Sequence, residues 1–512
     1  MAMRPENLRF ILGLKLRTLR QEQNASLKEV SERSGLSMSY LSEIEKGKKY
    51  PSPDKLLGLA EAFNVTYDDL VSLNVDDKLD PLKEMFSSPF IQEFPFELFG
   101  LAPHDVFSLV SDAPTKAGAL IRTFLEVGRT YDMQVEHFLF AALRSYQQMH
   151  DNYFPDLEDA ADAFRRQHDW PRTASLSDTT LRSLLEDEFG YTIDVDVLPN
   201  HDTLHPFRSV FVDGNGNPPT FYVNGDLMPI QRAFIYAREI GYNVLDVEER
   251  ARTSSWIRAE SFEQVLNNFK ASYFAGALIL NESSLLASLR SWFDASAWDD
   301  GAFLRTQMDR FQATPEMLYY RLTQLVPHHF DLTAFFFLRF HHEQGSPDYH
   351  LTKMLNLSGI PVPHGIGLRE HYCQRWPAIQ LLKELSEAQA QDDYTHDPSN
   401  ASAAVRAQRS HFINADAEFF TLSTARPLAL KDTTNSCVSI GFLMDDAFRR
   451  QVQFAHDPAI TRREVNLTCE RCPLTHAQCQ ERVAPRTLYD KEQREQQQIE
   501  ALRELTNDTR SA

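Results

Sequence analysis

Apolar residues within residues 1–73 recur three and four positions apart, which is the spacing of helices that turn one face toward a shared core. Ser26 and Glu29 have the spacing of a capping box, which predicts the start of a helix. Gly35 can adopt the left-handed conformation of a tight turn, and Ser37 can cap the next helix. This succession predicts a helix-turn-helix, in which one helix braces the next against the DNA major groove. An ordinary helical hairpin is the alternative.

Three more helices complete the predicted N-terminal bundle. Residues 7–22 form the first, Ser52 caps and Pro53 opens the fourth, and a threonine–aspartate pair caps the fifth. Five helices with the helix-turn-helix second and third, followed by IEKGKKYPS, resemble the Cro/repressor-type helix-turn-helix family over residues 7–73. The resemblance implies a lambda-repressor-like DNA-binding head, a sequence-specific transcription regulator, and double-stranded DNA as its partner.

The exposed side of the third helix would face the bases, where serine bonds several base edges and glutamate accepts from cytosine. Lysine and arginine would bind phosphates and hold the register without selecting a sequence. Because one head recognises only a short half-site, we expect a homodimer on a palindromic operator, with half-sites about 10 bp apart. The predicted base contacts are Ser37, Ser39, Tyr40, Ser42 and Glu43, and the predicted phosphate contacts are Lys15, Arg20, Lys28, Lys46, Lys48 and Lys49.

The hydrophobic pattern changes several times after the head. Phenylalanine at helical spacing predicts a connecting helical layer. Further on, an alternating strand at 192–198 and a hairpin at Asp213-Gly-Asn-Gly precede two helices, which indicates an α+β fold. The whole chain is therefore expected to be multidomain and mainly α, with an α+β middle. The predicted division is a linker at 74–88, a connecting and dimerisation layer at 89–176, the α+β region at 177–300, a C-terminal sensor domain at 301–487 and a polar tail at 488–512.

The strand, the hairpin and the helix PIQRAFIYAREIGYNVL resemble the metallopeptidase-like domain of the ImmA/IrrE family. Such peptidases carry His-Glu-x-x-His on a helix, where two histidines bind zinc and the glutamate is the general base. Here Arg238, Glu239 and Tyr242 occupy that pattern, and Lys270 stands at the family's third ligand position. Cations repel Zn²⁺, so we expect a degenerate zincin-like domain with no catalytic residue. Arg238 and Lys270 would attract an anion instead, or would be surface cations without a ligand.

Three cysteines lie close together near the C-terminus, as Cys469-x₂-Cys472-x₆-Cys479. They present three thiolates from one loop and need a fourth ligand for a tetrahedral zinc or a four-iron cluster. Of the two other cysteines, Cys437 lies in an apolar run and is expected to be a buried structural thiol. Cys373 is available as a fourth ligand, and His476 is also within reach of the three thiolates. An iron–sulfur cluster (4Fe-4S), a structural zinc and free thiols remain the three alternatives.

These cysteines belong to a wider pattern that resembles the short-chain fatty acyl transcriptional regulators. The matching stretches are Lys353…Gly359, Cys373…Trp376, Glu418–Ser423 and Cys469–Pro485. The resemblance implies control of short-chain acyl metabolism by an acyl-CoA effector, and an iron–sulfur cluster on the cysteines. The spacing before the third tail cysteine is longer than is usual in that family, and no proline follows Cys373. An iron–sulfur redox sensor is the main rival function, and an active peptidase the lesser one.

Charge is distributed unevenly between the head and the rest of the chain. The 512 residues have a net charge of −20, with +1 in residues 1–73 and −21 beyond them. The acidic remainder would repel DNA, so it is not expected to form a second DNA-binding surface. No apolar run reaches the ~18 residues of a membrane span, and the N-terminus lacks the apolar region of a signal peptide. We therefore expect a cytoplasmic protein without a membrane partner.

Overall fold

The computed structural model describes residues 5–71, apart from 24, and residues 135–511, apart from 215, 217, 254–258, 260, 364–369, 392–393, 396, 398 and 400–402. The chain divides into two compact units, Met1–Tyr146 with Arg258–Val265 and Gln147–Ile257 with Leu266–Ala512. The predicted linker at 74–88 and most of the predicted connecting layer at 89–176 lie outside the described residues.

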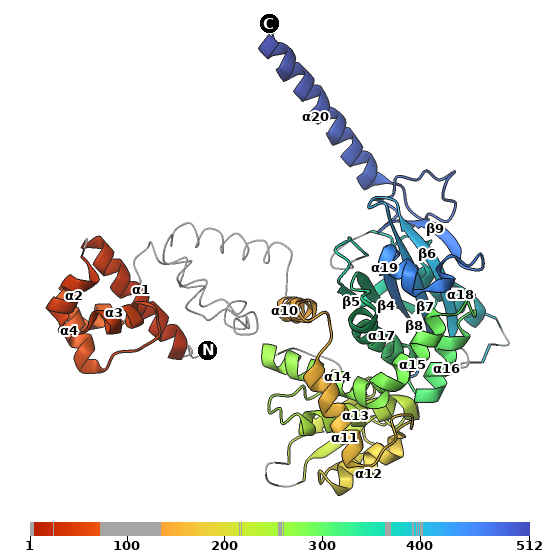
Figure 1. The fold of residues 1–512 in the computed structure, drawn as a ribbon, viewed down its shortest axis with the longest axis horizontal. Coiled ribbons are helices and arrows are strands. Elements are labelled where there is room, and N and C mark those ends of the chain that lie inside the picture. Colours follow the sequence, from red (N-terminus) through yellow and green to blue (C-terminus); the bar gives the residue numbers. More distant parts are fainter. Residues whose placement is uncertain are drawn as a thin grey trace. The chain divides into compact units, whose positions relative to one another are not determined.

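Local sequence features determine where the helices of the head begin and end. Ser26 Oγ accepts from the N–H of Glu29 at 3.2 Å, and the Glu29 carboxylate accepts from the N–H of Ser26 at 2.6 Å, so the predicted capping box is present. Gly35 has a φ of 69° in the turn, and Ser37 caps the next helix through the N–H of Tyr40. The described helices of the head are α1 (Pro5–Glu22), α2 (Leu27–Ser34), α3 (Met38–Glu45), α4 (Pro53–Phe63) and α5 (Tyr67–Val71) (Figure 1).

The core of the head forms where α1 crosses α3 at close range. Gly13 permits the approach, because a Cβ at this position would collide with the backbone oxygen of Ile44. Leu16, Val30 and Leu41 pack into the same core, and burying each such side chain contributes about 1.5–3 kcal/mol. One predicted cap is wrong: Ser52 stands at the N-cap of α4, but its hydroxyl makes no capping bond there.

A small sheet and its neighbouring helices come next along the chain, and Figure 1 labels the helices as α10 to α14, of which α10 begins in the first unit. Strands β2 and β3 form the predicted hairpin, and β1 pairs with β3 in parallel. The strand predicted at 192–198 is shorter than expected, because the chain turns where Asp194 accepts from the N–H groups of Asp196 and Val197. The elements are α10 (Val135–Met149), α11 (Pro155–Gln167), α12 (Asp178–Asp187), β1 (Thr192–Asp194), β2 (Ser209–Val212), β3 (Thr220–Val223), α13 (Pro229–Val244) and α14 (Phe262–Ile279).

The rest of the second unit contains a six-stranded sheet in the order β5-β4-β8-β7-β6-β9, which corrects the expectation that strands are confined to the middle of the chain. The helices before it are α15 (Glu282–Phe293), α16 (Ala302–Phe311) and α17 (Pro315–Phe330). The remaining elements are β4 (Phe335–Glu343), β5 (Tyr349–Asn356), α18 (Pro377–Gln389), β6 (Ala404–Phe412), β7 (Ala417–Leu428), β8 (Lys431–Leu443), α19 (Asp446–Gln451), the 3₁₀ helix η3 (Gln453–His456), β9 (Thr461–Val465) and α20 (Thr487–Ser511).

Helices cover both faces of this sheet. On one face Phe336 and Leu338 pack with Trp376 at the start of α18, as successive side chains of a strand point to opposite sides. On the other face Tyr320 of α17 meets the ring of Phe337 edge-on, with centroids 5.6 Å apart. The sheet therefore joins α17 to the region of α18, where Cys373 lies. Among the described helices, none is long and apolar enough to cross a membrane.

Candidate functional sites

The N-terminal half of α3 is the most accessible part of the helix-turn-helix. Ser37 and Ser39 are exposed, and Ser42 and Glu43 are partly exposed. Two lysines make cation–π contacts with Tyr40: Lys55 Nζ lies 4.3 Å and Lys49 Nζ 5.6 Å from the ring centroid. Lys55 was missed from the sequence, because only the fold brings α4 beside this tyrosine. Met38, whose side chain is also exposed, adds an apolar contact at the start of the helix.

Four of the predicted phosphate-binding lysines are exposed, namely Lys28, Lys46, Lys48 and Lys49. Lys49 pairs with Glu43 at 2.8 Å, so a predicted base contact and a predicted phosphate contact lie side by side. Such an exposed pair is worth little by itself. It leaves both side chains free to exchange this contact for one with DNA.

Two other predicted phosphate contacts are wrong. The Lys15 side chain is buried, and its Nζ donates to the carbonyl oxygen of Asp69 at 2.7 Å. Arg20 donates from Nε and Nη2 to the carboxylate of Glu45 at 2.7 and 2.9 Å. Both cations therefore stabilise the head internally, since a bidentate guanidinium–carboxylate pair satisfies the same donors that a phosphate would take.

The glutamate of the degenerate zinc pattern is buried and paired. Glu239 Oε1 accepts from Arg250 Nη1 at 2.5 Å and from the Tyr191 hydroxyl at 2.8 Å. Burial raises the pKa of Glu239, and Arg250 opposes that effect. Its charged partner, Arg250, comes from the irregular segment after α13.

The other three residues of the degenerate pattern lie on α13 and α14 and make different contacts. The Tyr242 hydroxyl donates to Asn268 Oδ1 at 3.1 Å. Arg238 donates from Nη2 to Ser209 Oγ at 3.3 Å, and its buried Nε finds no hydrogen-bond partner among the described residues. Lys270 lies on α14 and is partly exposed.

Arg238 belongs to a group of cations that we call the cationic cluster, which gathers around the single carboxylate of Glu316 on α17. Arg426 Nη2 pairs with Glu316 Oε2 at 2.9 Å. Burial alone would raise the pKa of Glu316, but the attraction of Arg426 and two more guanidinium groups lowers it to about 2. Three cations therefore act on this one carboxylate, and Arg238 and Lys353 lie close to two of them. The cluster comprises Arg208, Arg238, Arg339, Lys353 and Arg426.

Two members of the cationic cluster keep exposed surface although protein surrounds them on most sides. Lys353 lies opposite Arg339 in the β4–β5 register. Crowding by the surrounding protein, followed by the charge of Arg339, lowers the pKa of Lys353 to about 7. The protein around Arg208 likewise excludes water from it and lowers the pKa of Arg208 below its ordinary value. Cations that are short of counter-charges and open to solvent favour an anionic ligand.

The four predicted metal-binding cysteines come together from two loops. Cys373 precedes α18, and the other three follow β9; all four are buried. Backbone bonds join the loops, from the N–H of Cys373 to the oxygen of Leu467 at 3.2 Å and from the N–H of Cys469 to the oxygen of His371 at 2.8 Å. Burial, with a contribution from Cys469 and Cys472, raises the pKa of Cys373 to about 12. Cys437 is buried in the sheet, apart from these loops.

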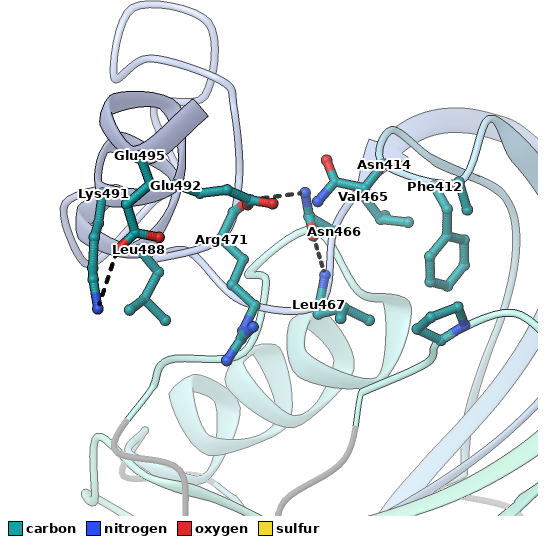
Figure 2. A pocket seen from close by; sticks show the side chains of 12 residues that line it. Phe412, Asn414, Val465, Asn466, Leu467, Arg471, Leu488, Lys491, Glu492 and Glu495 are labelled. Carbon is teal, nitrogen blue, oxygen red and sulfur yellow. Dashed lines mark hydrogen bonds and ion pairs between the residues drawn. The ribbon is translucent and has the colours of Figure 1, made fainter. Parts of the chain in front are cut away.

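No group of three or more histidine, cysteine, aspartate or glutamate side chains within the described residues converges tightly enough to hold one metal ion. A pocket of about 510 Å³ adjoins the cysteine loop (Figure 2). Arg471 and Leu467 of that loop line one side, and Leu488 and Lys491 of α20 line the other. Arg471 is already engaged by Glu370 at 2.7 Å. The polar tail expected at 488–512 is therefore a helix whose first turns complete this pocket.

Comparison with known proteins agrees with two parts of this description. Residues 16–70 match the helix-turn-helix family model, and residues 194–323 match that of the IrrE N-terminal-like domain. An uncharacterized helix-turn-helix-type transcriptional regulator of Sinorhizobium fredii is 36% identical over 66 residues, which are 13% of this chain and 86% of that protein. This chain belongs to the helix-turn-helix transcriptional regulators.

Other relatives match the head of this regulator alone. The helix-turn-helix-type regulator DdrOP3 of Deinococcus deserti is 39% identical over 57 residues, 11% of this chain and 44% of that protein. The transcriptional regulator ClgR of Mycobacterium tuberculosis is 40% identical over 58 residues, 11% of this chain and 52% of that protein. A solved Mycobacterium tuberculosis transcriptional regulator is 19% identical with a TM-score of 0.44, covering 68% of this chain and 93% of that chain.

Proposed function

We propose that this regulator binds a palindromic operator as a homodimer and that a small anionic effector, a short-chain acyl-CoA, controls the binding. The exposed N-terminal half of α3 supports operator binding. The cationic cluster carries the proposal for the effector, because three cations share the carboxylate of Glu316 and two more lie beside them, which leaves positive charge unbalanced. An effector can alter DNA affinity only through its different affinities for the two states of the protein.

The effector class follows from the chemistry of the cluster. Coenzyme A esters carry several phosphate groups, and arginine binds phosphate with two parallel hydrogen bonds. Arg208 and Lys353 are exposed and can reach a ligand from solvent, and Arg238 is partly exposed and lies close to Arg208. The short-chain acyl group of the resembling family is the best candidate for the remaining part of the ligand. The Discussion gives the binding experiment.

We also propose that the IrrE-like domain has no peptidase activity. The position of the first zinc-binding histidine holds Arg238, and the buried Glu239 is bonded to Arg250 and Tyr191 rather than free to activate water. The domain would then serve as a frame that brings Arg208 and Arg238 to the cluster.

The DNA-binding part of the proposal is tested by substituting one cation and one acidic residue of the head. Lys48→Ala should weaken binding to all sequences alike and reduce the salt slope by about one, because it removes one phosphate contact. Glu43→Ala should instead relax the preference at one base pair, worth about 1–3 kcal/mol. Fluorescence anisotropy at several salt concentrations, on an operator selected from random DNA, separates the two.

Glu61→Ala is the matched control, since Glu61 is exposed on α4 and lies outside the predicted contacts. Wild-type behaviour of both Lys48→Ala and Glu43→Ala would show that the DNA-facing surface is elsewhere.

A second candidate function, iron–sulfur sensing, is favoured by the gathering of four buried cysteines. Cys373, Cys469, Cys472 and Cys479 supply the four thiolates that a 4Fe-4S cluster requires. Within the described residues no three of these side chains already form a site for one metal ion, and a cluster of several metal atoms bridges its ligands over a longer distance than zinc does. Bound iron would supply a redox-active centre, while burial would restrict its access to solvent. The donor set therefore fits the cluster better than it fits zinc.

This second function is tested on protein purified without oxygen. We expect a brown protein with iron and sulfide in equal amounts, because four thiolates favour the cluster, and we expect Cys472→Ser to lose both. Cys437→Ala is the control and should keep them, because Cys437 lies apart in the sheet. A colourless wild-type protein that contains zinc would contradict the assignment. If the cluster is the sensor, exposure of the iron-loaded protein to air should change its affinity for the operator.

A further inference from the structure

The side chain of Tyr320, on α17, contacts two regions of the second unit, one through its ring and the other through its hydroxyl. The ammonium of Lys353 lies over the Tyr320 ring, with Nζ 3.5 Å from the ring centroid, so this ring borders the cationic cluster. Its hydroxyl accepts from Gln147 Nε2 at 2.7 Å. Gln147 lies near the end of α10 and is the first residue of the second unit.

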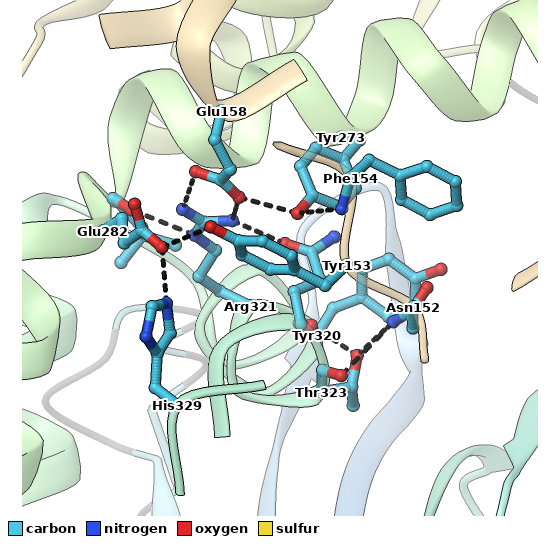
Figure 3. A network of polar contacts seen from close by, with 12 residues as sticks. Asn152, Tyr153, Phe154, Glu158, Tyr273, Glu282, Tyr320, Arg321, Thr323 and His329 are labelled. Atoms are coloured by element: carbon cyan, nitrogen blue, oxygen red, sulfur yellow. Dashed lines mark hydrogen bonds and ion pairs between the residues drawn. The ribbon is translucent and has the colours of Figure 1, made fainter. Parts of the chain in front are cut away.

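The turn that follows Gln147 depends on bonds to α17. Asp151 and Asn152 have φ values of 48° and 55°, in the left-handed region that non-glycine residues adopt at a cost. Asn152 is fully buried; its Oδ1 accepts from Gln147 Nε2 at 2.8 Å, and its Nδ2 donates to Thr323 Oγ1 at 2.9 Å. Figure 3 shows Asn152 beside Thr323 of α17. The turn is thus held in its conformation by side chains one helical turn apart on α17.

We propose that Tyr320 couples occupancy of the cationic cluster to the conformation of the Gln147–Asn152 turn, which makes it a positioning residue for the response to the effector. The proposal rests on the effector site put forward above and names how that site acts. A phosphate bound at the cluster competes with the tyrosine ring for Lys353, and a charge-assisted bond to phosphate is the stronger contact. Removing the ammonium alters the packing of Tyr320 and with it the bond to Gln147. By linkage, operator binding must change effector affinity by the same factor.

The experiment that tests this coupling needs no effector. Hydrogen exchange followed by mass spectrometry on the full chain reports the amides of residues 147–154. Lys353→Met should speed their exchange at least threefold, because it removes the cation from the Tyr320 ring. In the Tyr320→Phe background, which keeps the ring and loses the hydroxyl, the same Lys353→Met change should have no further effect. Gln147→Leu, which breaks the same hydrogen bond from the other side, should abolish the response equally.

Tyr319→Phe is the matched control. Tyr319 is the neighbouring residue, and its hydroxyl lies 2.7 Å from Thr424 Oγ1 instead of near the turn. The response to Lys353→Met should persist in this background. The coupling is refuted if Lys353→Met leaves exchange at 147–154 unchanged, or if its effect survives in Tyr320→Phe.

A second arm uses propionyl-CoA as the probe. It should bind wild type and Tyr320→Phe within about twofold of each other, but change exchange at 147–154 only in wild type. Failure to bind wild type would reject the proposed effector and leave the coupling to be decided by the Lys353→Met result. Equal changes in exchange in both proteins would reject the coupling and leave the effector standing.

Discussion

Arg321→Met is expected to lower the free energy of unfolding of the second unit by about 3–5 kcal/mol, because it leaves a buried carboxylate without its partner. Arg321 is 1% exposed and donates from Nη1 and Nη2 to the two oxygens of Glu158 at 2.6 and 2.7 Å. Its Nε donates to the oxygen of Leu280 at 3.0 Å. One side chain thus joins α11, the end of α14 and α17, as Figure 3 shows.

Glu158 shows why the loss should be large. Burial alone would raise its pKa, yet the charge and hydrogen bonds of Arg321 hold that pKa below the ordinary value. The pair therefore stabilises the fold at pH values above the ordinary titration range of a carboxyl. This stability is lost as the pH falls through the lowered pKa of Glu158. Without Arg321, the Glu158 carboxyl must either take up a proton or reach solvent through local unfolding.

Urea denaturation followed by circular dichroism measures this effect. Arg172→Met is the matched control, since Arg172 pairs with Asp162 at 2.8 Å near the surface, with 56% of its side chain exposed; it should cost less than about 1 kcal/mol. The double variant Glu158→Leu with Arg321→Met should recover much of the loss, since it removes both charges. A single Arg321→Met variant as stable as the control would contradict the prediction.

The affinity of propionyl-CoA should fall about tenfold between pH 6 and pH 8, because the ammonium of Lys353 loses its proton in that range. The surrounding protein and Arg339 lower the pKa of Lys353 to about 7. An anionic ligand prefers the protonated amine and raises its pKa on binding, so binding weakens as the pH rises through the pKa of the free protein. About one-tenth of the amine remains protonated one unit above that value. Isothermal titration calorimetry at pH 6, 7 and 8 measures the trend.

The other charged groups near Lys353 should not titrate in this window. Burial, aided by Arg339, lowers the pKa of His341 to about 4, and the pKa of Glu316 is about 2. Burial raises the pKa of Tyr320 to about 12, and the arginines stay charged. Lys353→Arg is the control, because it keeps a permanent cation at this position. Any pH dependence that this variant retains comes from the ligand's own phosphates. An equal pH dependence in wild type and Lys353→Arg would exclude Lys353 as the titrating group.

Local patterns predicted the elements that local interactions stabilise. The capping box at Ser26, the left-handed turn at Gly35 and the hairpin of β2 and β3 need only neighbours a few residues away, and all three are present. The six-stranded sheet was missed because its pairs are remote in the sequence. Phe335 of β4 pairs with Phe442 of β8, and β9 pairs in parallel with β6. A short apolar run such as FFFLRF fits a buried helix as well as a strand.

The sequence by itself determined the kind of head this regulator has, the loss of the zinc-binding pattern at Arg238, and the presence of a cysteine-rich loop. Only the tertiary structure decided what the charged residues do. It placed Lys15 inside the head and paired Glu239 with Arg250. It also collected the cationic cluster from five separate strands, loops and helices. The reason is that residue type and spacing specify backbone conformation over a few residues, whereas the role of a charge depends on partners and burial that the fold brings from hundreds of residues away.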